Sequence, residues 1–398
     1  MEITANKITA IKISDTAVRE ILELYPEEGL VERQAFQNAF TSGSMDFDLL
    51  KKESQTISVP WQLFLLKHSK LKQQLEHIEK QRIHKVSSKL MAKRKGSGSV
   101  TSKRIIDRLI RQQNYLLSQS RFLDNSLCGL LKHHSVQKAA AKLTKFIEFD
   151  QDRFWKVSSK ESALDHLIKN VEAKNINVSR GVLSNKILPH IASARDVYRN
   201  TSGFVIKDTK VPFIFLPSEI NPDEVASRQI YTLVYLLVII GLEEYNYFLE
   251  EDFNTKLLTA SKMEKRTHAI TSEVLIPRVE SDKLKSVEVT EAIRNEWCKK
   301  LKVSPTAFVT ALRIRRVIDK SKYEELLPEP FDPKQKKKSQ ARTPRVSSSA
   351  RKFCGMYSYD AINNGIKSKT LASTQAQYLL FGTINKAGYK KYRNELGI

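Results

Sequence analysis

The sequence contains few cysteines and no pattern that would use them as metal ligands or as a disulfide framework. Its three cysteines, Cys128, Cys298 and Cys354, lie far apart, and no Cys-x-x-Cys or Cys/His spacing links them. This usage is typical of a reducing compartment, where thiols stay buried or inert. The first residues show no basic stretch followed by an apolar one. We therefore expect a cytoplasmic protein without a signal peptide.

Long apolar runs and phosphate-binding loops are also absent. The longest apolar run, residues 230–242, covers about 13 residues, fewer than the roughly 20 that cross a membrane. We expect it to form a buried helix, and we predict no membrane partner. The glycines of residues 96–99 follow no predicted strand and lack the GxGxxG or GxxxxGK[ST] spacing. The sequence therefore predicts no bound cofactor, and no Ser/His/Asp or Cys/His arrangement is visible from spacing.

Positive charge is abundant and unevenly distributed. The chain has 398 residues, enough for two or three domains, and 41% of them are hydrophobic, as in a globular protein. It carries 67 Lys and Arg against 44 Asp and Glu, a net charge of +23. The first 50 residues are acidic, whereas residues 67–111 and 334–352 are densely basic. This excess favours an anionic partner, most simply nucleic acid, over a merely solvated surface.

Two polar linkers carry the densest positive charge. Their candidate phosphate contacts are Lys93, Arg94, Lys95, Lys334, Lys336, Lys337, Lys338, Arg342 and Arg345. Flexible cations neutralise phosphates without reading base edges, so we expect binding that depends on salt and tolerates sequence changes. A protein partner is the alternative explanation of the charge.

The spacing of apolar residues predicts a mostly helical α+β protein. The predicted helices after a small helical region at the N-terminus cover residues 61–85, 105–117, 127–146, 162–176, 223–248, 260–276, 289–301 and 306–318. The predicted strand covers residues 177–183. Ser304 and Pro305 suit the cap and the first turn of the last helix.

One predicted helix contains a recognisable motif in which the residues that carry the chemistry are replaced by other residue types. Residues 228–241 read Arg-Gln-Ile-Tyr-Thr-Leu-Val-Tyr-Leu-Leu-Val-Ile-Ile-Gly. This resembles the zinc helix of the ImmA/IrrE metallopeptidases, (R/Q)xxFTLxHExxH. Residues 203–206 and 211–216 resemble the two strands that precede this helix in the family, which implies strands at those positions. Residues 264–277 resemble its E-x-x-x-N-x-x-A-A-E-x-L-M-P segment, and residues 303–312 its closing V-S-x-x-A-V-x-x-R-L stretch.

The resemblance extends to long family members in which an XRE-like helix-turn-helix domain precedes the peptidase. Residues 42–64 resemble the end of that domain. The implied organisation is a degenerate helix-turn-helix-like region at 1–60, a long-helix region at 61–150 with a basic linker at 86–103, a degenerate zincin-like pseudo-peptidase domain at 151–327, a basic linker at 328–352 and a small C-terminal piece at 353–398. The last two form a basic C-terminal extension.

The metal-ligand positions differ from the family pattern. Tyr235, Leu236 and Ile239 stand where His, Glu and His are expected, and Glu264 falls on the third ligand. Zinc needs imidazole or carboxylate ligands, and hydrolysis needs a glutamate base. We therefore predict a non-catalytic relative without a bound metal, with a regulatory role such as transcription regulation in a bacterial, prophage or mobile-element system. The alternative is an active metal-dependent endopeptidase that cleaves a repressor or antitoxin with an unrecognised ligand set.

Several further roles remain open from the sequence. His268, one helical turn after Glu264, is either a metal ligand or a hydrogen-bonded structural residue, and a hydrogen bond from Tyr235 to Glu264 is a hypothesis. Residues 15–60 lack the basic recognition helix that a major-groove reader needs. The helices at 289–301 and 306–318 form either a second helix-turn-helix-like pair, with three arginines near its end, or an ordinary closing pair of the scaffold.

Overall fold

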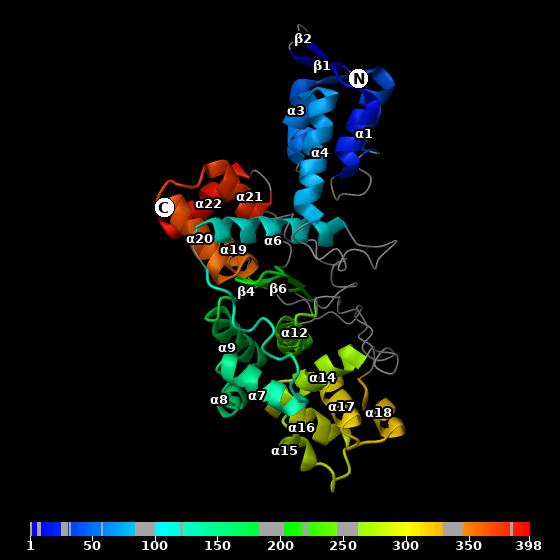
Figure 1. Ribbon diagram of the computed structural model, residues 1–398, viewed down its shortest axis with the longest axis vertical. Helices are drawn as coiled ribbons and strands as arrows, with labels where there is room; N and C mark the ends of the chain where they lie inside the picture. Colours follow the sequence, from blue (N-terminus) through cyan, green and yellow to red (C-terminus); the bar gives the residue numbers. More distant parts are fainter. Residues whose placement is uncertain are drawn as a thin grey trace.

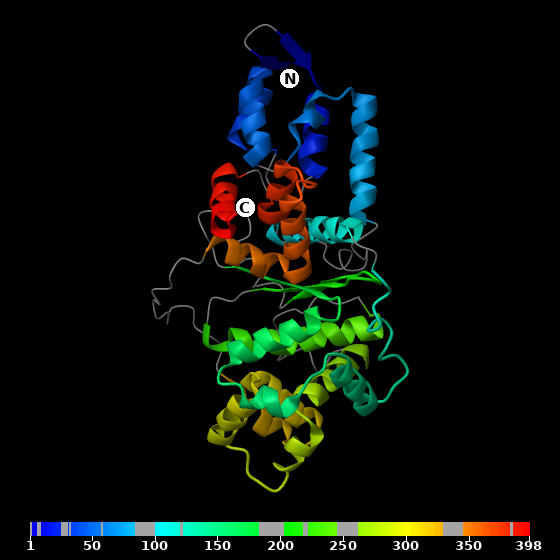
Figure 2. The same ribbon diagram turned by 90° about the vertical axis from the view of Figure 1, so that its left-hand side faces the viewer.

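The computed structural model confirms a mostly helical protein with small sheets. It describes residues 2–5, 9–24, 31, 33–56, 59–83, 100–119, 122–182, 203–217, 222–244, 262–328, 345–382 and 385–398. The N-terminal unit lies at one end of an elongated molecule, and a layered assembly of helices around a sheet follows it (Figures 1 and 2).

The N-terminal unit combines helices with a three-stranded sheet. Its elements are β1 (Glu2–Ala5), β2 (Thr9–Lys12), α1 (Asp15–Leu24), α2 (Gln34–Ser42), β3 (Ser44–Asp46), α3 (Phe47–Thr56), the 3-10 helix η1 (Trp61–Leu65) and α4 (His68–Ile83). Strand β1 pairs antiparallel with β2 and parallel with β3. The rings of Phe36 and Phe64 stack 6.2 Å apart in its core.

Two sequence expectations for this unit need correction. The strands were not predicted, because they span only three or four residues and present few buried side chains such as Ile3 and Met45. The single helix expected at 61–85 is divided, because Leu66 adopts an extended conformation between η1 and α4.

A second sheet lies at the centre of the layered assembly and is covered on both faces (Figure 2). Its strands are β4 (Asn177–Arg180), β5 (Phe204–Ile206) and β6 (Phe213–Leu216). Strand β6 is central, parallel to β4 and antiparallel to β5. Phe213 and Phe215 join one hydrophobic cluster, while Ile214 and Leu216 join another. Burial on both faces explains why these strands read as continuous apolar runs.

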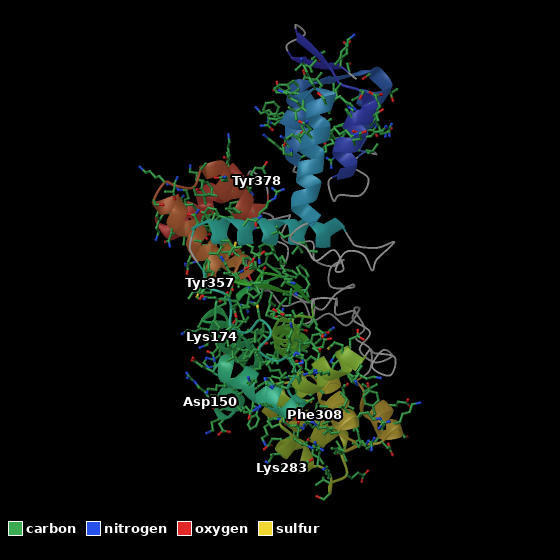
Figure 3. All side chains as sticks on the ribbon, in the orientation of Figure 1. Asp150, Lys174, Lys283, Phe308, Tyr357 and Tyr378 are labelled. Atoms are coloured by element: carbon green, nitrogen blue, oxygen red, sulfur yellow. The ribbon has the colours of Figure 1, made fainter. Side chains whose placement is uncertain are left out.

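One face of the sheet is covered by helices from distant parts of the sequence. These are α6 (Val100–Gln119), α19 (Val346–Cys354), α20 (Met356–Lys367), α21 (Ser373–Phe381) and α22 (Lys386–Leu396). Tyr357 and Tyr378 lie in this layer (Figure 3). Gln112 Nε2 of α6 donates to the Leu379 carbonyl over 2.8 Å, which joins α6 to α21. Residues 353–398, for which the sequence predicted no fold, therefore contain three helices and the end of a fourth.

The opposite face is covered by the region that contains the predicted peptidase-like helices. Its elements are α7 (Val136–Phe146), α8 (Gln151–Lys156), α9 (Lys160–Glu172), α12 (Pro222–Leu242), α14 (Lys262–Leu275), α15 (Arg278–Asp282), α16 (Glu291–Leu301), α17 (Pro305–Ile314) and α18 (Lys320–Leu326). The Ser304 side chain accepts from Ala307 N and caps α17, as predicted. Strands β5 and β6, the buried helix α12 and helix α14 thus follow one another along the chain in the expected order.

Other boundaries differ from expectation for local reasons. The helix expected at 127–146 begins only at Val136, because Gly129 and His133 adopt left-handed conformations with φ of 75° and 56°. Helices α6 and α19 begin at Val100 and Val346, inside the ranges expected for the two basic linkers.

A buried polar junction fastens the sheet to the C-terminal helices. Asn177 Nδ2 donates to the Cys354 carbonyl over 2.7 Å, and Asn177 Oδ1 accepts from Ser358 N over 3.2 Å. Between them, Gly355 has a φ of 75°, and a Cβ there would lie 2.6 Å from Asn177 Nδ2. The turn therefore requires glycine, and the C-terminal helices pack as part of the layered assembly.

Candidate functional site

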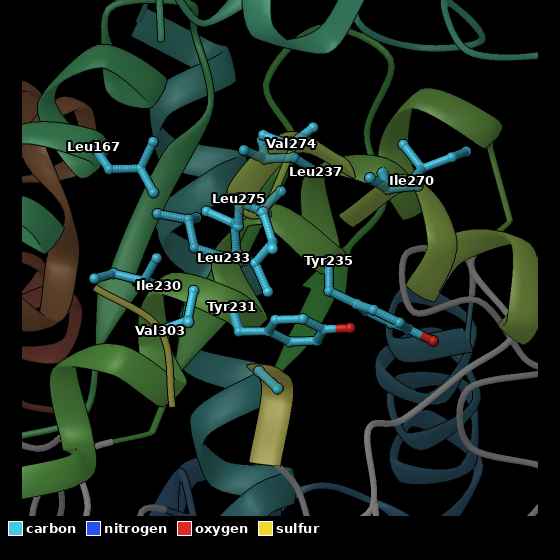
Figure 4. Close-up of a cluster of buried hydrophobic side chains, with 14 of the residues drawn as sticks. Leu167, Ile230, Tyr231, Leu233, Tyr235, Leu237, Ile270, Val274, Leu275 and Val303 are labelled. Atoms are coloured by element: carbon cyan, nitrogen blue, oxygen red, sulfur yellow. The ribbon is translucent and has the colours of Figure 1, made fainter. Parts of the chain in front are cut away.

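Helix α12 carries Tyr235, Leu236 and Ile239, the positions that the resemblance assigns to metal ligands, and is buried within the protein (Figure 4). Tyr235, Leu236 and Ile239 expose 2%, 0% and 2% of their surface. All three belong to the hydrophobic cluster that α12 shares with α9 and α14. In the described part of the chain, no helix combines the length and apolarity needed to cross a membrane. The position of α12 in the hydrophobic core therefore explains its apolar run.

Hydrocarbon and two aromatic rings occupy the place where the resemblance would put a metal. Tyr231 and Tyr235 are one helical turn apart on α12, with their hydroxyl groups on the same side (Figure 4). The Tyr231 hydroxyl lies 2.9 Å from Nδ1 of His268 on α14. The ring of Tyr235 lies 4.7 Å from the His268 ring at an angle of 50°. His268 therefore contacts both tyrosines.

Burial fixes the protonation of this group. It lowers the pKa of His268 to about 4 and raises the pKa of the Tyr231 hydroxyl. Both side chains are neutral at physiological pH, so a phenol and an uncharged imidazole share the hydrogen bond, and the tautomer of His268 sets which of the two donates. A neutral phenol–imidazole pair is a structural hydrogen bond between two helices. Sequence analysis left two roles open for His268, and the geometry favours the structural one.

The described residues contain no group of three His, Cys, Asp or Glu side chains that could hold a metal ion. Glu264, the position of the third ligand, is half-buried on α14 one turn before His268. The hydrogen bond from Tyr235 to Glu264 stays a prediction. The signal that sequence analysis missed is the one-turn spacing of Tyr231 and Tyr235, which allows both rings to meet a single residue on the next helix.

Most of the predicted phosphate contacts fall outside the described residues. These are Lys93, Arg94, Lys95, Lys334, Lys336, Lys337, Lys338 and Arg342. Arg345 is described and is exposed directly before α19.

Many cations of the region around α12 and α14 are occupied by partners within the protein. Arg315, one of the three arginines near the end of the second helix-turn-helix candidate, pairs with Glu273 over 3.0 Å and donates to Ser281 Oγ over 2.8 Å. Arg294 on α16 donates to the Leu326 carbonyl over 2.7 Å. Both arginines are largely buried. These contacts favour the ordinary structural role for the helix pair α16 and α17.

In the C-terminal helices, by contrast, cations far outnumber acidic residues. Residues 345–398 contain nine Lys and Arg but only two acidic residues, Asp360 and Glu395. Glu395 is used internally, because its carboxylate accepts from Ser347 N over 2.8 Å and from Val346 N over 3.3 Å and so caps α19. Four exposed lysines make no ion pair with any described residue: Lys367, Lys369, Lys386 and Lys390. Sequence analysis missed this surface because its cations are spread along three helices.

No protein-family model, curated protein or solved structure matches the chain. The likeness to the ImmA/IrrE metallopeptidases therefore rests on the motifs and on their order along the chain.

Proposed function

We propose that this protein is a non-catalytic relative of the ImmA/IrrE metallopeptidases that binds nucleic acid as a regulator in a bacterial or prophage system. The observation that carries the proposal is the complete burial of Leu236 where the family has its catalytic glutamate. Burying a leucine side chain contributes about 1.5–3 kcal/mol to stability, whereas an isolated carboxylate there would cost far more. Position 236 thus serves the core of the protein.

Electrostatics supports the nucleic-acid part of the proposal. The net charge of +23 needs an anionic counterpart, and the exposed lysines of the C-terminal helices lack partners among the described residues. The sequence-predicted linker cations Lys93–Lys95 and Lys336–Lys338 lie outside the described residues and would add positive charge toward the same partner. Such contacts bind the phosphate backbone and contribute little to sequence recognition.

An active endopeptidase is the competing function. It would use Glu264 and His268, one turn apart on α14, with further ligands from outside the described residues. The hydrogen bond between His268 Nδ1 and Tyr231 weighs against this use, because it occupies one of the two nitrogens that bind metals.

Metal analysis separates the two functions. The full-length protein is purified without chelators, and its mass is measured under native conditions before and after dialysis with zinc. The proposal predicts a mass equal to that of the polypeptide in both samples and no cleavage of a general peptide library. One tightly held zinc ion per chain, together with cleavage that a chelator abolishes, would establish the endopeptidase instead.

A further inference from the structure

A basic cleft lies where three C-terminal helices meet. It has a volume of about 510 Å³ and is lined by the end of α20, the start of α21 and the last turns of α22. Its polar side chains are Lys367, Lys369, Ser373 and Arg393. Arg393 Nε donates to the Ile398 backbone oxygen over 3.0 Å, which holds the guanidinium group at the edge of the cleft. Three cations from two helices and a turn thus converge on one space.

The elements around the cleft have the arrangement of a helix, a short turn and a second helix. Helix α20 ends at Lys367, and α21 begins at Ser373 and packs against it. The last turn of α21 is anchored by buried Leu380 and Phe381. Its first turn is exposed and polar, with Ser373 lining the cleft and Thr374 and Gln375 following it on the surface. In helix-turn-helix proteins the first turn of the second helix meets base edges, while neighbouring cations hold phosphates.

The same surface favours double-stranded over single-stranded nucleic acid. Proteins that bind single strands stack bases on exposed aromatic rings. No aromatic side chain with described burial is exposed in this protein. Tyr389, which lines the cleft, is buried at 7% exposure, and Tyr378 on α21 is half-buried. A helix of this kind fits the wide major groove of B-form DNA better than the narrow one of double-stranded RNA.

We propose that the cleft between α20, α21 and α22 binds the backbone of duplex DNA, with Lys367, Lys369 and Arg393 holding phosphates and the start of α21 facing the groove. This inference rests on the proposed nucleic-acid binding and assigns it a location and a preferred partner. Within this surface, the exposed lysines Lys386 and Lys390 extend the positive charge along α22.

The test uses the full-length protein and one double variant of the cleft, Lys367→Gln with Lys369→Asn. Asparagine is chosen because Lys369 has a φ of 60°, a left-handed conformation that asparagine tolerates well. The control, Lys138→Gln with Lys142→Gln on α7, removes the same charge from the other end of the layered assembly. Thermal unfolding verifies that all proteins are folded. Fluorescence anisotropy with a short random-sequence DNA duplex then gives affinity as a function of salt.

We expect the cleft variant to reduce the slope of log affinity against log salt by about two units, and the control to leave it within about half a unit. If the cleft variant binds DNA with the same affinity and salt slope as the control variant, the cleft assignment is wrong, while the proposed function still stands. Tighter binding to a single strand than to the duplex would overturn the choice of partner. Failure of the wild-type protein to bind any nucleic acid would remove both proposals.

Discussion

The hydroxyl group of Tyr231 lies 2.9 Å from Nδ1 of His268 and joins helices α12 and α14 in the interior of the protein. In the metallopeptidases that this chain resembles, the corresponding helices supply the ligands of a zinc ion. Here a neutral hydrogen bond and a tilted contact with the Tyr235 ring connect them. These two contacts therefore connect the helices directly.

The buried imidazole of His268 makes stability dependent on pH. Its pKa is about 4 in the folded protein, against 6.5 for the free side chain, because burial disfavours the charged form. As the pH falls from about 6.5 to about 4, the imidazole of His268 therefore binds a proton in the unfolded chain but not in the folded protein. We expect the free energy of unfolding to fall over that range by up to about 3 kcal/mol from this group. Above pH 6.5 the effect is absent.

Urea denaturation at about pH 7.5 and about pH 4.5 measures this effect in the wild-type protein and in His268→Gln. The glutamine keeps an acceptor for Tyr231 and does not titrate, so the variant should lose less stability on acidification. The exposed His68→Gln serves as the control and should behave like wild type. Equal acid sensitivity of His268→Gln and wild type would contradict the buried, neutral imidazole.

Substitution of Leu236 tests whether the position that the resemblance aligns with the catalytic glutamate lies in the core or in a cleft. Leu236→Met conserves volume and should cost less than about 1.5 kcal/mol. Leu236→Glu restores the family residue but buries a carboxyl group without a partner, and we expect it to destabilise the protein by more than about 3 kcal/mol or to prevent folding. The measurement is the midpoint of thermal unfolding. A glutamate variant as stable as the methionine variant would mean that position 236 faces an open polar cleft.

Asn177 tests the attachment of the C-terminal helices to the sheet. Asn177→Ala removes both hydrogen bonds to the turn around Gly355 and leaves buried backbone groups unpaired, at a cost of about 2–4 kcal/mol. The exposed Asn364→Ala on α20 is the matched control. We expect limited proteolysis to release the segment from 345 onward sooner in the Asn177 variant only. Identical cleavage of both variants would show that this junction does not hold the layer.

The sequence predicted those features that arise from local pattern. The buried helix α12 and the cap of α17 by Ser304 follow from the apolar run and from capping chemistry, and the strands β5 and β6 were expected from the family resemblance. The sequence did not predict that α6 and the C-terminal helices cover one face of the central sheet, because this layer depends on contacts between residues far apart in the chain. Gln112 and Leu379, which join α6 to α21, are 267 residues apart, and no pattern near either residue indicates the other.

The features of the candidate site likewise divide into those that the sequence predicted and those that it did not. The missing ligands at Tyr235, Leu236 and Ile239 are visible in the sequence, since each residue type excludes a chemistry. Composition also revealed the excess of positive charge. The distinction between paired and unpaired cations was not visible, because it depends on tertiary contacts such as that between Arg315 and Glu273. The cleft at Lys367 and Arg393 likewise exists only once α20 and α22 are packed together.

The central claim, that this protein binds nucleic acid through its phosphates, is tested most directly by the salt dependence of duplex affinity in the full-length chain. Between about 50 and about 200 mM salt, we expect affinity to fall by roughly three orders of magnitude and to vary little among unrelated duplex sequences. Replacing Lys336, Lys337 and Lys338 with alanine should lower the slope of log affinity against log salt by about two to three units. Affinity that does not change with salt would contradict the account and indicate a protein partner. Affinity that survives loss of both Lys93–Lys95 and Lys336–Lys338 unchanged would contradict the role of the linkers and leave the cleft to carry the binding.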